Sequence, residues 1–301
     1  MSSMVESVAN HDSSIEIQVL VRKGHGQLYF GNPKINKVWE FDKSEKLKNI
    51  IKLGYELKRE FFTVIFNCHR FVSSSFIAFL AKPKTLIGYN KNPLSIFFTK
   101  KVAHQFDSSI HEIDRNHSLL QSHWASIENK RPRLYPSSEN YRKIENFNSN
   151  EYVVIAPSSV WFTKQYPIQG WRNLISRLAD VDIFLIGAPH DKETCNQIAA
   201  GFSNTNVLAG ELSLMESIAL IGKATKVYAC DSAPTHMATA MNVETHTVFC
   251  STDSSFGFGP KADRAFIHES NVLLKCRPCG IHGKKICPEG HFSCAKYDIE
   301  V

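Results

Sequence analysis

The chain has 301 residues, of which 43% are hydrophobic, and its formal net charge is +6. A chain of this length can bury a large core and exceeds the usual size of one domain, so we expect two domains. No apolar run is long enough to cross a bilayer, and residues 1–6 do not resemble a signal peptide, so we expect a cytoplasmic protein. The small basic excess suits an anionic substrate, a lipid surface or simply a solvated surface, and is too small to indicate nucleic acid.

In the first half of the chain, apolar runs alternate with stretches of helical periodicity. Strands are expected at residues 15–21 and 61–66, and helices at 47–58 and 71–80. This alternation predicts parallel α/β units.

A polar stretch at residues 132–150 is rich in Ser, Asn and charge, and predicts a linker between an N-terminal domain at 1–131 and a C-terminal domain at 151–301. The alternation then restarts, with strands expected at 152–156, 182–186, 226–229 and 245–250 and a helix at 171–179. The second half therefore predicts a doubly wound domain of the nucleotide-binding type. Its ligand should lie beyond the carboxyl ends of the strands.

The junction between the strand at 226–229 and the residues after it is the most informative part of the chain. The strand runs into Asp231, and Pro234 suits the first turn of a following helix. Ser232 is expected to cap the free backbone donors, which together with the positive helix end favour a diphosphate nearby. An ordinary capped helix after a strand explains the same residues. Polar residues elsewhere must therefore decide between a diphosphate site and a purely structural helix start.

Two further strand ends carry polar residues. Ser158, Thr163 and Lys164 follow the strand at 152–156, and a lysine there can neutralise a phosphate. Ser213 caps another helix, and Glu216 either completes a capping box with it or binds ribose hydroxyls. Lysine, glutamate and aspartate at successive strand ends predict a sugar-nucleotide pocket.

Four of the eight cysteines lie near the end of the chain, namely Cys276, Cys279, Cys287 and Cys294, with His282 and His291 between them. This crowding is unlike a secreted disulfide framework, and the remaining cysteines are expected to be reduced thiols. One CxxC pair with two more cysteines could enclose a structural zinc ion. The second pair is not a CxxC, so a cluster without metal stays an alternative, and no catalytic metal is expected.

The order of these motifs resembles glycosyltransferase family 9, the ADP-heptose:lipopolysaccharide heptosyltransferases. In the second half the resemblance rests on residues 157–159, 163–167, 186–187, 208–210, 212–216, 231–238 and 256–260, together with Trp171. In the first half it rests on residues 21–24, 31–33, 38–42, 69–70, 87–89 and 111–116. The tail at 287–294 is also of a type seen in that family.

The resemblance implies a GT-B architecture of two Rossmann-like domains, the first for the acceptor and the second for the nucleotide sugar. The implied reaction is an inverting transfer of heptose from ADP-heptose to the inner core of lipopolysaccharide, without a required metal. The partners would be that donor and an anionic acceptor, and the implied place is the cytoplasm of a bacterium or the inner leaflet of its inner membrane.

The resemblance also assigns roles to residues of this chain. Lys164 would contact the donor phosphates, Glu216 the ribose and Asp231 the donor sugar. Backbone donors of the segment from Ala233 to His236, which contains Pro234, would lie near the diphosphate, although His236 is as readily a helix residue that bonds locally. Ser158 and Thr163 are secondary donor-binding candidates, and His69 and Arg70 are candidates on the acceptor side.

The chain departs from the family at its front. Family members begin with an apolar strand and a Gly-Asp turn that carries the proposed catalytic base, whereas this chain opens in a helix expected at residues 4–9. It contains no Gly-Asp dipeptide, so no residue inherits the base, and we expect the first domain to lack its first strand. The chain would then be a fragment, the product of a late start codon or a degenerate copy.

Two classes of function follow from this departure. The chain is either a working heptosyltransferase with another base, such as Asp12 or His69, or an inactive donor-binding remnant or regulatory partner. A GT-B enzyme that uses another nucleotide sugar is a third reading. A zinc-bearing nucleic-acid module is disfavoured because the chain has no basic stripe with interleaved aromatic residues.

Overall fold

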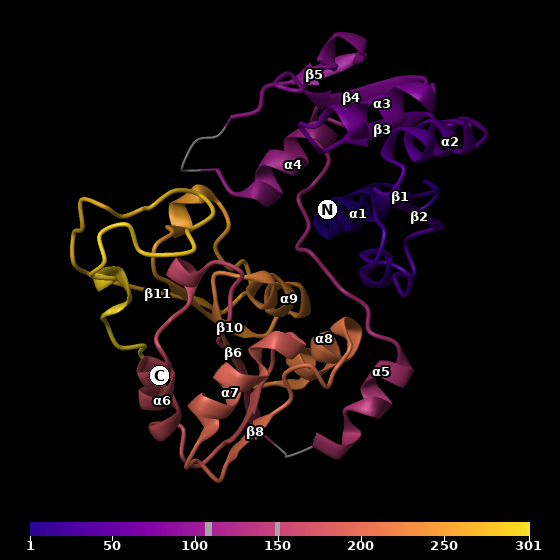
Figure 1. Ribbon diagram of the computed structural model, residues 1–301. Coiled ribbons are helices and arrows are strands. Elements are labelled where there is room, and N and C mark those ends of the chain that lie inside the picture. Colours follow the sequence, from indigo (N-terminus) through magenta and orange to yellow (C-terminus); the bar gives the residue numbers. More distant parts are fainter. Residues whose placement is uncertain (106–109, 148–150) are drawn as a thin grey trace. The chain divides into compact units, whose positions relative to one another are not determined.

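The computed structural model describes residues 1–105, 110–147 and 151–301 of the chain (Figure 1). The chain divides into two compact units, Met1–Tyr135 and Pro136–Val301. The second unit thus includes residues 136–147, whose composition had placed them in the linker. They contain α5 (Ser138–Lys143), which begins with a capping box between Ser137 and Asn140, and the apolar side chain of Ile144 after α5 is buried in the core of the unit.

The strands of the first unit form two separate parallel ladders. One pairs β1 (Gln18–Arg22) with β2 (Lys37–Phe41). The other has the order β3 (Val64–Asn67), β4 (Thr85–Tyr89), β5 (Lys100–Val102). Among the described residues, β1 and β3 each pair with a strand on one side only. The first unit is therefore a parallel α/β unit whose sheet is divided in two.

Among the residues described in the first unit, four helices cover the strands, namely α1 (Ser2–His11), α2 (Lys46–Lys58), α3 (Val72–Leu80) and α4 (Glu112–Gln121). An apolar cluster joins Leu20 of β1, Leu53 of α2 and Ile65 of β3. A second cluster joins Met4 of α1 to Ile87 of β4. Side-chain packing therefore links the two ladders although no strand pairing does.

The described residues of the second unit form one parallel sheet of six strands in the order β11-β10-β9-β6-β7-β8. Its strands are β6 (Tyr152–Ala156), β7 (Asp182–Leu185), β8 (Thr205–Val207), β9 (Lys226–Cys230), β10 (Glu244–Phe249) and β11 (Ala265–Glu269). The four strands predicted for this half are confirmed to within one residue at each end. All six lie in parallel register, so their carboxyl ends meet along one edge of the sheet.

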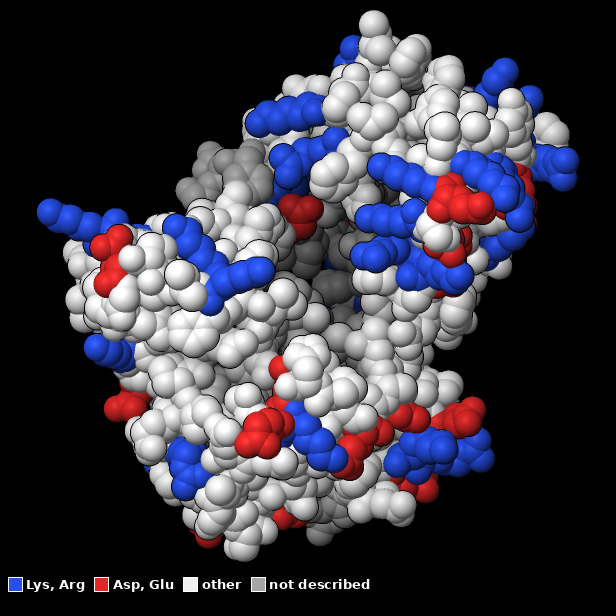
Figure 2. All heavy atoms as spheres, in the orientation of Figure 1, with Lys and Arg blue, Asp and Glu red and all other residues white. Residues whose placement is uncertain are grey.

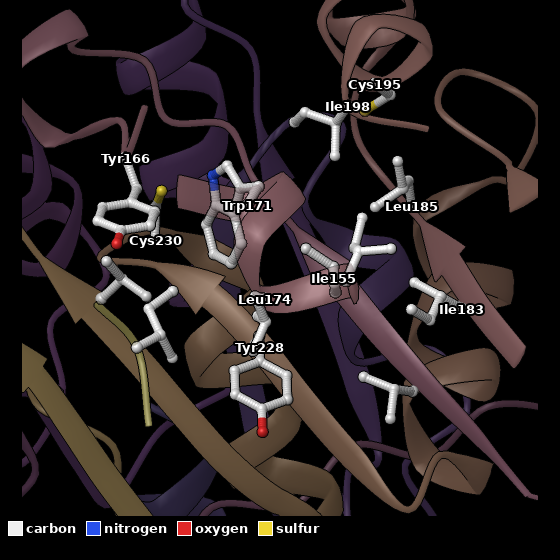
Figure 3. Packing of buried hydrophobic residues seen from close by; sticks show 14 of the residues in the cluster. Ile155, Tyr166, Trp171, Leu174, Ile183, Leu185, Cys195, Ile198, Tyr228 and Cys230 are labelled. Atoms are coloured by element: carbon white, nitrogen blue, oxygen red, sulfur yellow. The ribbon is translucent and has the colours of Figure 1, made fainter. Parts of the chain in front are cut away.

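Helices cover both faces of this sheet: α6 (Ile168–Ser176) and α7 (Lys192–Ala199) on one, and α5, α8 (Leu214–Lys223) and α9 (Ala233–Met241) on the other. Val153 and Ile155 of β6 face the cluster of Trp171 and Leu174 of α6, whereas Val154 faces the opposite cluster. Figure 3 shows Trp171 and Leu174 beside Ile155. Burial on both faces explains the unbroken apolar run of β6.

Charged side chains on the face drawn in Figure 2 lie densely over the first unit near α2, with acidic and basic residues interleaved. Lys48 lies 3.1 Å from Glu45, and Lys52 lies 3.9 Å from Glu56. A helix face of mixed sign is unlike the uniformly basic stripe of a nucleic-acid binder. Within the described ranges, no helix is long and apolar enough to span a bilayer.

A chain of hydrogen bonds crosses β10 and β11 inside the second unit. Oε1 of Glu244 lies 3.0 Å from Nε2 of His246, and Nδ1 of His246 lies 2.9 Å from Nε2 of His268. Because the carboxylate can only accept, Nε2 of His246 donates to Glu244. Burial lowers the pKa of both His246 and His268 and so favours neutral rings, in which Nδ1 of His246 accepts from Nε2 of His268. Tyr228 stacks on His246 with 4.3 Å between ring centroids.

This histidine pair predicts a loss of stability in acid. Burial lowers the pKa of His268 to about 4 and also lowers the pKa of His246. In the unfolded chain each imidazole takes up a proton near pH 6.5, so the unfolded state binds more protons below that pH. The stabilising contribution is present above about pH 6.5 and is lost as the pH falls toward 4. Urea unfolding at pH 7.5 and 5.5 should show this loss, and His268→Gln should show a smaller one; parallel losses would contradict the assignment.

Candidate active site

A buried ion pair lies at the carboxyl edge of the second unit's sheet. Lys164 ends the short 3-10 helix η4 (Phe162–Lys164) that follows β6, and Asp231 directly follows β9. Nζ of Lys164 lies 2.7 Å from Oδ2 of Asp231, and the two side chains are only 14% and 10% exposed. The structure thus brings together two of the residues that the sequence placed in one pocket.

Thr252 is a third member of this cluster that the sequence reasoning missed. Its hydroxyl donates to Oδ2 of Asp231 at 2.7 Å, and it is buried. Thr252 follows β10, so it belongs to the same edge of the sheet as Asp231 and Lys164. Its place just beyond the expected strand at 245–250 was the signal that could have identified it.

The start of α9 lies next to Asp231. Pro234 occupies the first turn, as predicted, and Ala233 and His236 are exposed there. The expected cap by Ser232 is wrong: Ser232 holds the N-cap position, but its hydroxyl donates back to the carbonyl of Cys230 at 3.1 Å. The first turn therefore has no side-chain cap, which leaves it suited to an external anion.

Glu216 forms the capping box with Ser213. The Ser213 N–H donates to Oε2 of Glu216 at 2.7 Å, and the Glu216 N–H donates to the Ser213 hydroxyl at 3.3 Å. Oε1 of Glu216 makes no hydrogen bond to a described residue. The two expected roles are therefore compatible, because a ribose hydroxyl can still bond to Oε1.

The remaining candidates of the β6 loop differ in accessibility. Ser158 is half-buried just beyond the carboxyl end of β6. Thr163 is only 1% exposed. Its Oγ1 accepts hydrogen bonds from the Lys284 N–H at 2.7 Å and the Ser251 hydroxyl at 2.8 Å. The Thr163 hydroxyl is therefore buried and hydrogen-bonded within the protein, and it is not available to bind a ligand.

In the first unit, His69 and Arg70 lie beyond the carboxyl end of β3 and are exposed. The His69 ring packs edge-on against Phe71 at 6.3 Å. Asp12 lies at the C-cap of α1, on the segment that leads into the amino end of β1, where it bonds to Ser14. Of the two alternative bases, only His69 occupies the strand end at which ligands of parallel sheets bind.

The cysteine cluster does not have the geometry of a zinc site. Within the described part of the chain, no three His, Cys, Asp or Glu residues are arranged to hold a metal ion. Cys294 is 5% exposed and packs in the apolar core of the second unit. Cys279 directs its thiol to the Cys276 carbonyl at 3.2 Å, and Cys276 lies 3.8 Å from His291. These residues do not fit the tetrahedral zinc considered from the spacing.

Comparisons with known protein families and with curated proteins both match heptosyltransferases. The model of glycosyltransferase family 9 (heptosyltransferase) matches residues 50–290. Lipopolysaccharide heptosyltransferase 1 of Escherichia coli strain K12 is 26% identical over 175 residues, which cover 56% of this chain and 54% of that protein. The chain thus spans about half the length of this curated relative.

Two solved structures share the fold. A family 9 glycosyl transferase from Veillonella parvula superposes with a TM-score of 0.82 at 15% identity, covering 98% of this chain and 91% of the other. E. coli heptosyltransferase WaaC with ADP gives a TM-score of 0.72 at 19% identity, with 92% and 93% covered. The expected fold class, α/β with parallel sheets as in GT-B heptosyltransferases, is confirmed. Since the family model matches most of its length, the chain belongs to glycosyltransferase family 9.

Proposed function

We propose that this chain is an inverting glycosyltransferase that binds ADP-heptose in its second unit and transfers the heptose to the inner core of lipopolysaccharide. The observation that carries the proposal is the buried pair of Lys164 and Asp231 beside the uncapped start of α9. Family membership supports the donor class, and a heptosyltransferase of similar fold has been solved with ADP.

Each residue has a distinct role in this proposal. The diphosphate lies at the start of α9, where the helix dipole is positive and the backbone N–H groups of Ala233 and His236 lie. Pro234 has no N–H, and the Thr235 N–H donates to the Ser232 carbonyl at 3.2 Å. Lys164 supplies a point charge to the phosphates, and Asp231 accepts hydrogen bonds from sugar hydroxyls. Oε1 of Glu216 accepts from the ribose.

The chemistry requires two kinds of assistance. An acceptor hydroxyl attacks the anomeric carbon of the heptose, its proton passes to a base, and ADP leaves from the opposite face. Negative charge grows on the departing diphosphate, where Lys164 and the start of α9 stabilise it. No metal ion is required, because these groups supply the positive charge. His69 is the better placed of the two alternative bases in the first unit.

Calorimetric titration with ADP tests donor binding. We expect ADP to bind the wild-type chain and to bind Lys164→Ala at least about tenfold more weakly, because the variant leaves the Asp231 carboxylate unpaired near the phosphates. Lys192→Ala is the matched control, since Lys192 pairs with Glu211 at 3.0 Å on the exposed surface. Equal binding by wild type and Lys164→Ala, or no binding by either, would contradict the proposal.

A second candidate is a donor-binding remnant with impaired catalysis. The absence of a Gly-Asp dipeptide and the division of the first unit's sheet favour it. Titration with UDP and GDP beside ADP distinguishes a transferase for another nucleotide sugar from these two candidates, because such an enzyme would bind a different nucleotide more tightly than ADP. As acceptor we propose the anionic lipopolysaccharide core, reached from the cytoplasm at the inner leaflet of the inner membrane.

A further inference from the structure

The segment after β11 forms hydrogen bonds to backbone carbonyls of the strand-end loop that carries Thr252. Nε of Arg277 donates to the Cys250 carbonyl at 2.8 Å, and Nη2 donates to the Thr252 carbonyl at 3.0 Å. The Cys279 N–H donates to the Ser251 carbonyl at 2.8 Å. Residues 277–284, which we name the clasp, are therefore anchored to the loop whose Thr252 hydroxyl bonds Asp231.

The same clasp is bonded to the loop that carries Lys164. The Thr163 N–H donates to the Lys284 carbonyl at 3.1 Å, and the Lys284 N–H donates to Oγ1 of Thr163 at 2.7 Å. The Ser251 N–H donates to the Thr163 carbonyl at 3.1 Å, and its hydroxyl donates to Oγ1 of Thr163. Thr163 thus joins the clasp to both loops, and it directly precedes Lys164.

Gly283 brings the clasp against the side chain of Lys164. Its φ is +74°, a conformation that glycine adopts readily. A Cβ at this position would lie 2.8 Å from Cγ of Lys164 and 3.1 Å from Cβ of Trp161. The backbone of Gly283 therefore packs directly against the stem of the Lys164 side chain, whose ammonium pairs with Asp231.

We propose that the clasp, residues 277–284, is a positioning element of the donor site that fixes the Lys164 ammonium at the diphosphate position through Gly283 and the Thr163–Lys284 bonds. The inference rests on the proposed function, because it assigns the clasp to the same donor site. It also gives the clasp, which includes Cys279, a role that requires no metal: the clasp holds two loops that are distant in sequence at one fixed separation.

Substitution of two glycines tests this role. Gly283→Ala should weaken ADP binding roughly tenfold, because the added methyl group displaces the Lys164 stem. Gly290→Ala is the matched control: Gly290 has a φ of +68°, so alanine meets the same backbone strain, but it has no neighbour within 4 Å. We expect Gly290→Ala to bind ADP within about twofold of wild type.

A double-mutant cycle separates positioning from a general structural effect. In a Lys164→Ala background, Gly283→Ala should weaken ADP binding by no more than about twofold further, because the displaced side chain is already gone. An equal further loss in both backgrounds would overturn the inference. Equal binding by wild type and Gly283→Ala would overturn it while leaving the proposed function intact. Absence of ADP binding to wild type would overturn both.

A second pair of variants serves if Gly283→Ala does not fold. Thr163→Val removes the acceptor for the Lys284 N–H and should weaken ADP binding, whereas Thr163→Ser keeps the hydroxyl and should restore most of it. Equal affinities of wild type and Thr163→Val would overturn the inference.

Discussion

Heptose transfer by this chain should run roughly 10²-fold to 10⁴-fold slower than transfer by lipopolysaccharide heptosyltransferase 1 of E. coli, because a positioned general base contributes a factor of that size. The chain has no Gly-Asp dipeptide to supply the family's base. The donor site of the second unit, in contrast, has its lysine, its aspartate and an uncapped helix start. ADP binding should therefore be retained while turnover is strongly reduced.

The measurement is the initial rate of ADP release from ADP-heptose with a heptose-free lipopolysaccharide acceptor, for both proteins under the same conditions. His69→Ala reports whether the residual rate depends on the exposed imidazole beyond β3, and Asp12→Ala is its control, since Asp12 lies at the C-cap of α1, on the segment that leads into the amino end of β1. A rate equal to that of the E. coli enzyme would show that another residue replaces the base fully.

Asp231→Asn should lower the free energy of unfolding by about 3 kcal/mol, because it leaves the nearly buried Lys164 ammonium without its carboxylate. The asparagine oxygen can still accept from Thr252, so the loss of charge is the principal change. Bound ADP supplies a replacement anion, and ADP should therefore stabilise the variant more than it stabilises wild type.

Urea unfolding with and without ADP measures both effects. Glu211→Gln is the control, because it breaks an ion pair whose side chains are 52% and 48% exposed, and such pairs contribute less than about 1 kcal/mol. Equal destabilisation by the two substitutions would mean that the Lys164–Asp231 pair behaves as a surface pair. If ADP stabilised Asp231→Asn no more than it stabilises wild type, Lys164 would not contact the phosphates of bound ADP.

The sheet of the second unit could be predicted closely from local sequence. Residues 152–156 are apolar without interruption, and β6 has those bounds because helices cover both of its faces. The strand expected at 61–66 begins later, at Val64, because Phe61 has a φ of +51° and cannot extend the ladder. The helix expected at 171–179 begins at Ile168, since Pro167 in an extended conformation serves as its N-cap.

The candidate site was predictable where it depends on strand ends and not where it depends on contacts distant in sequence. Lys164 and Asp231 each follow a strand, so the parallel topology alone places them on one edge. The Ser232 hydroxyl can either cap the helix start or donate to the Cys230 carbonyl, and it does the latter. The sequence does not reveal which of the two the hydroxyl adopts. The bond from Lys284 to Thr163 spans 121 positions and has no periodic signature.

The divided sheet of the first unit has a consequence for how this unit opens. The ladder of β1 and β2 shares no strand pairing with the ladder of β3, β4 and β5 among the described residues. Separation of the two ladders therefore breaks side-chain contacts such as those of Leu20 and Ile65 but no backbone hydrogen bond between strands. Partial unfolding of one ladder can precede that of the other, so we expect the first unit to open in two subglobal steps, whereas the continuous sheet of the second unit favours a single cooperative one.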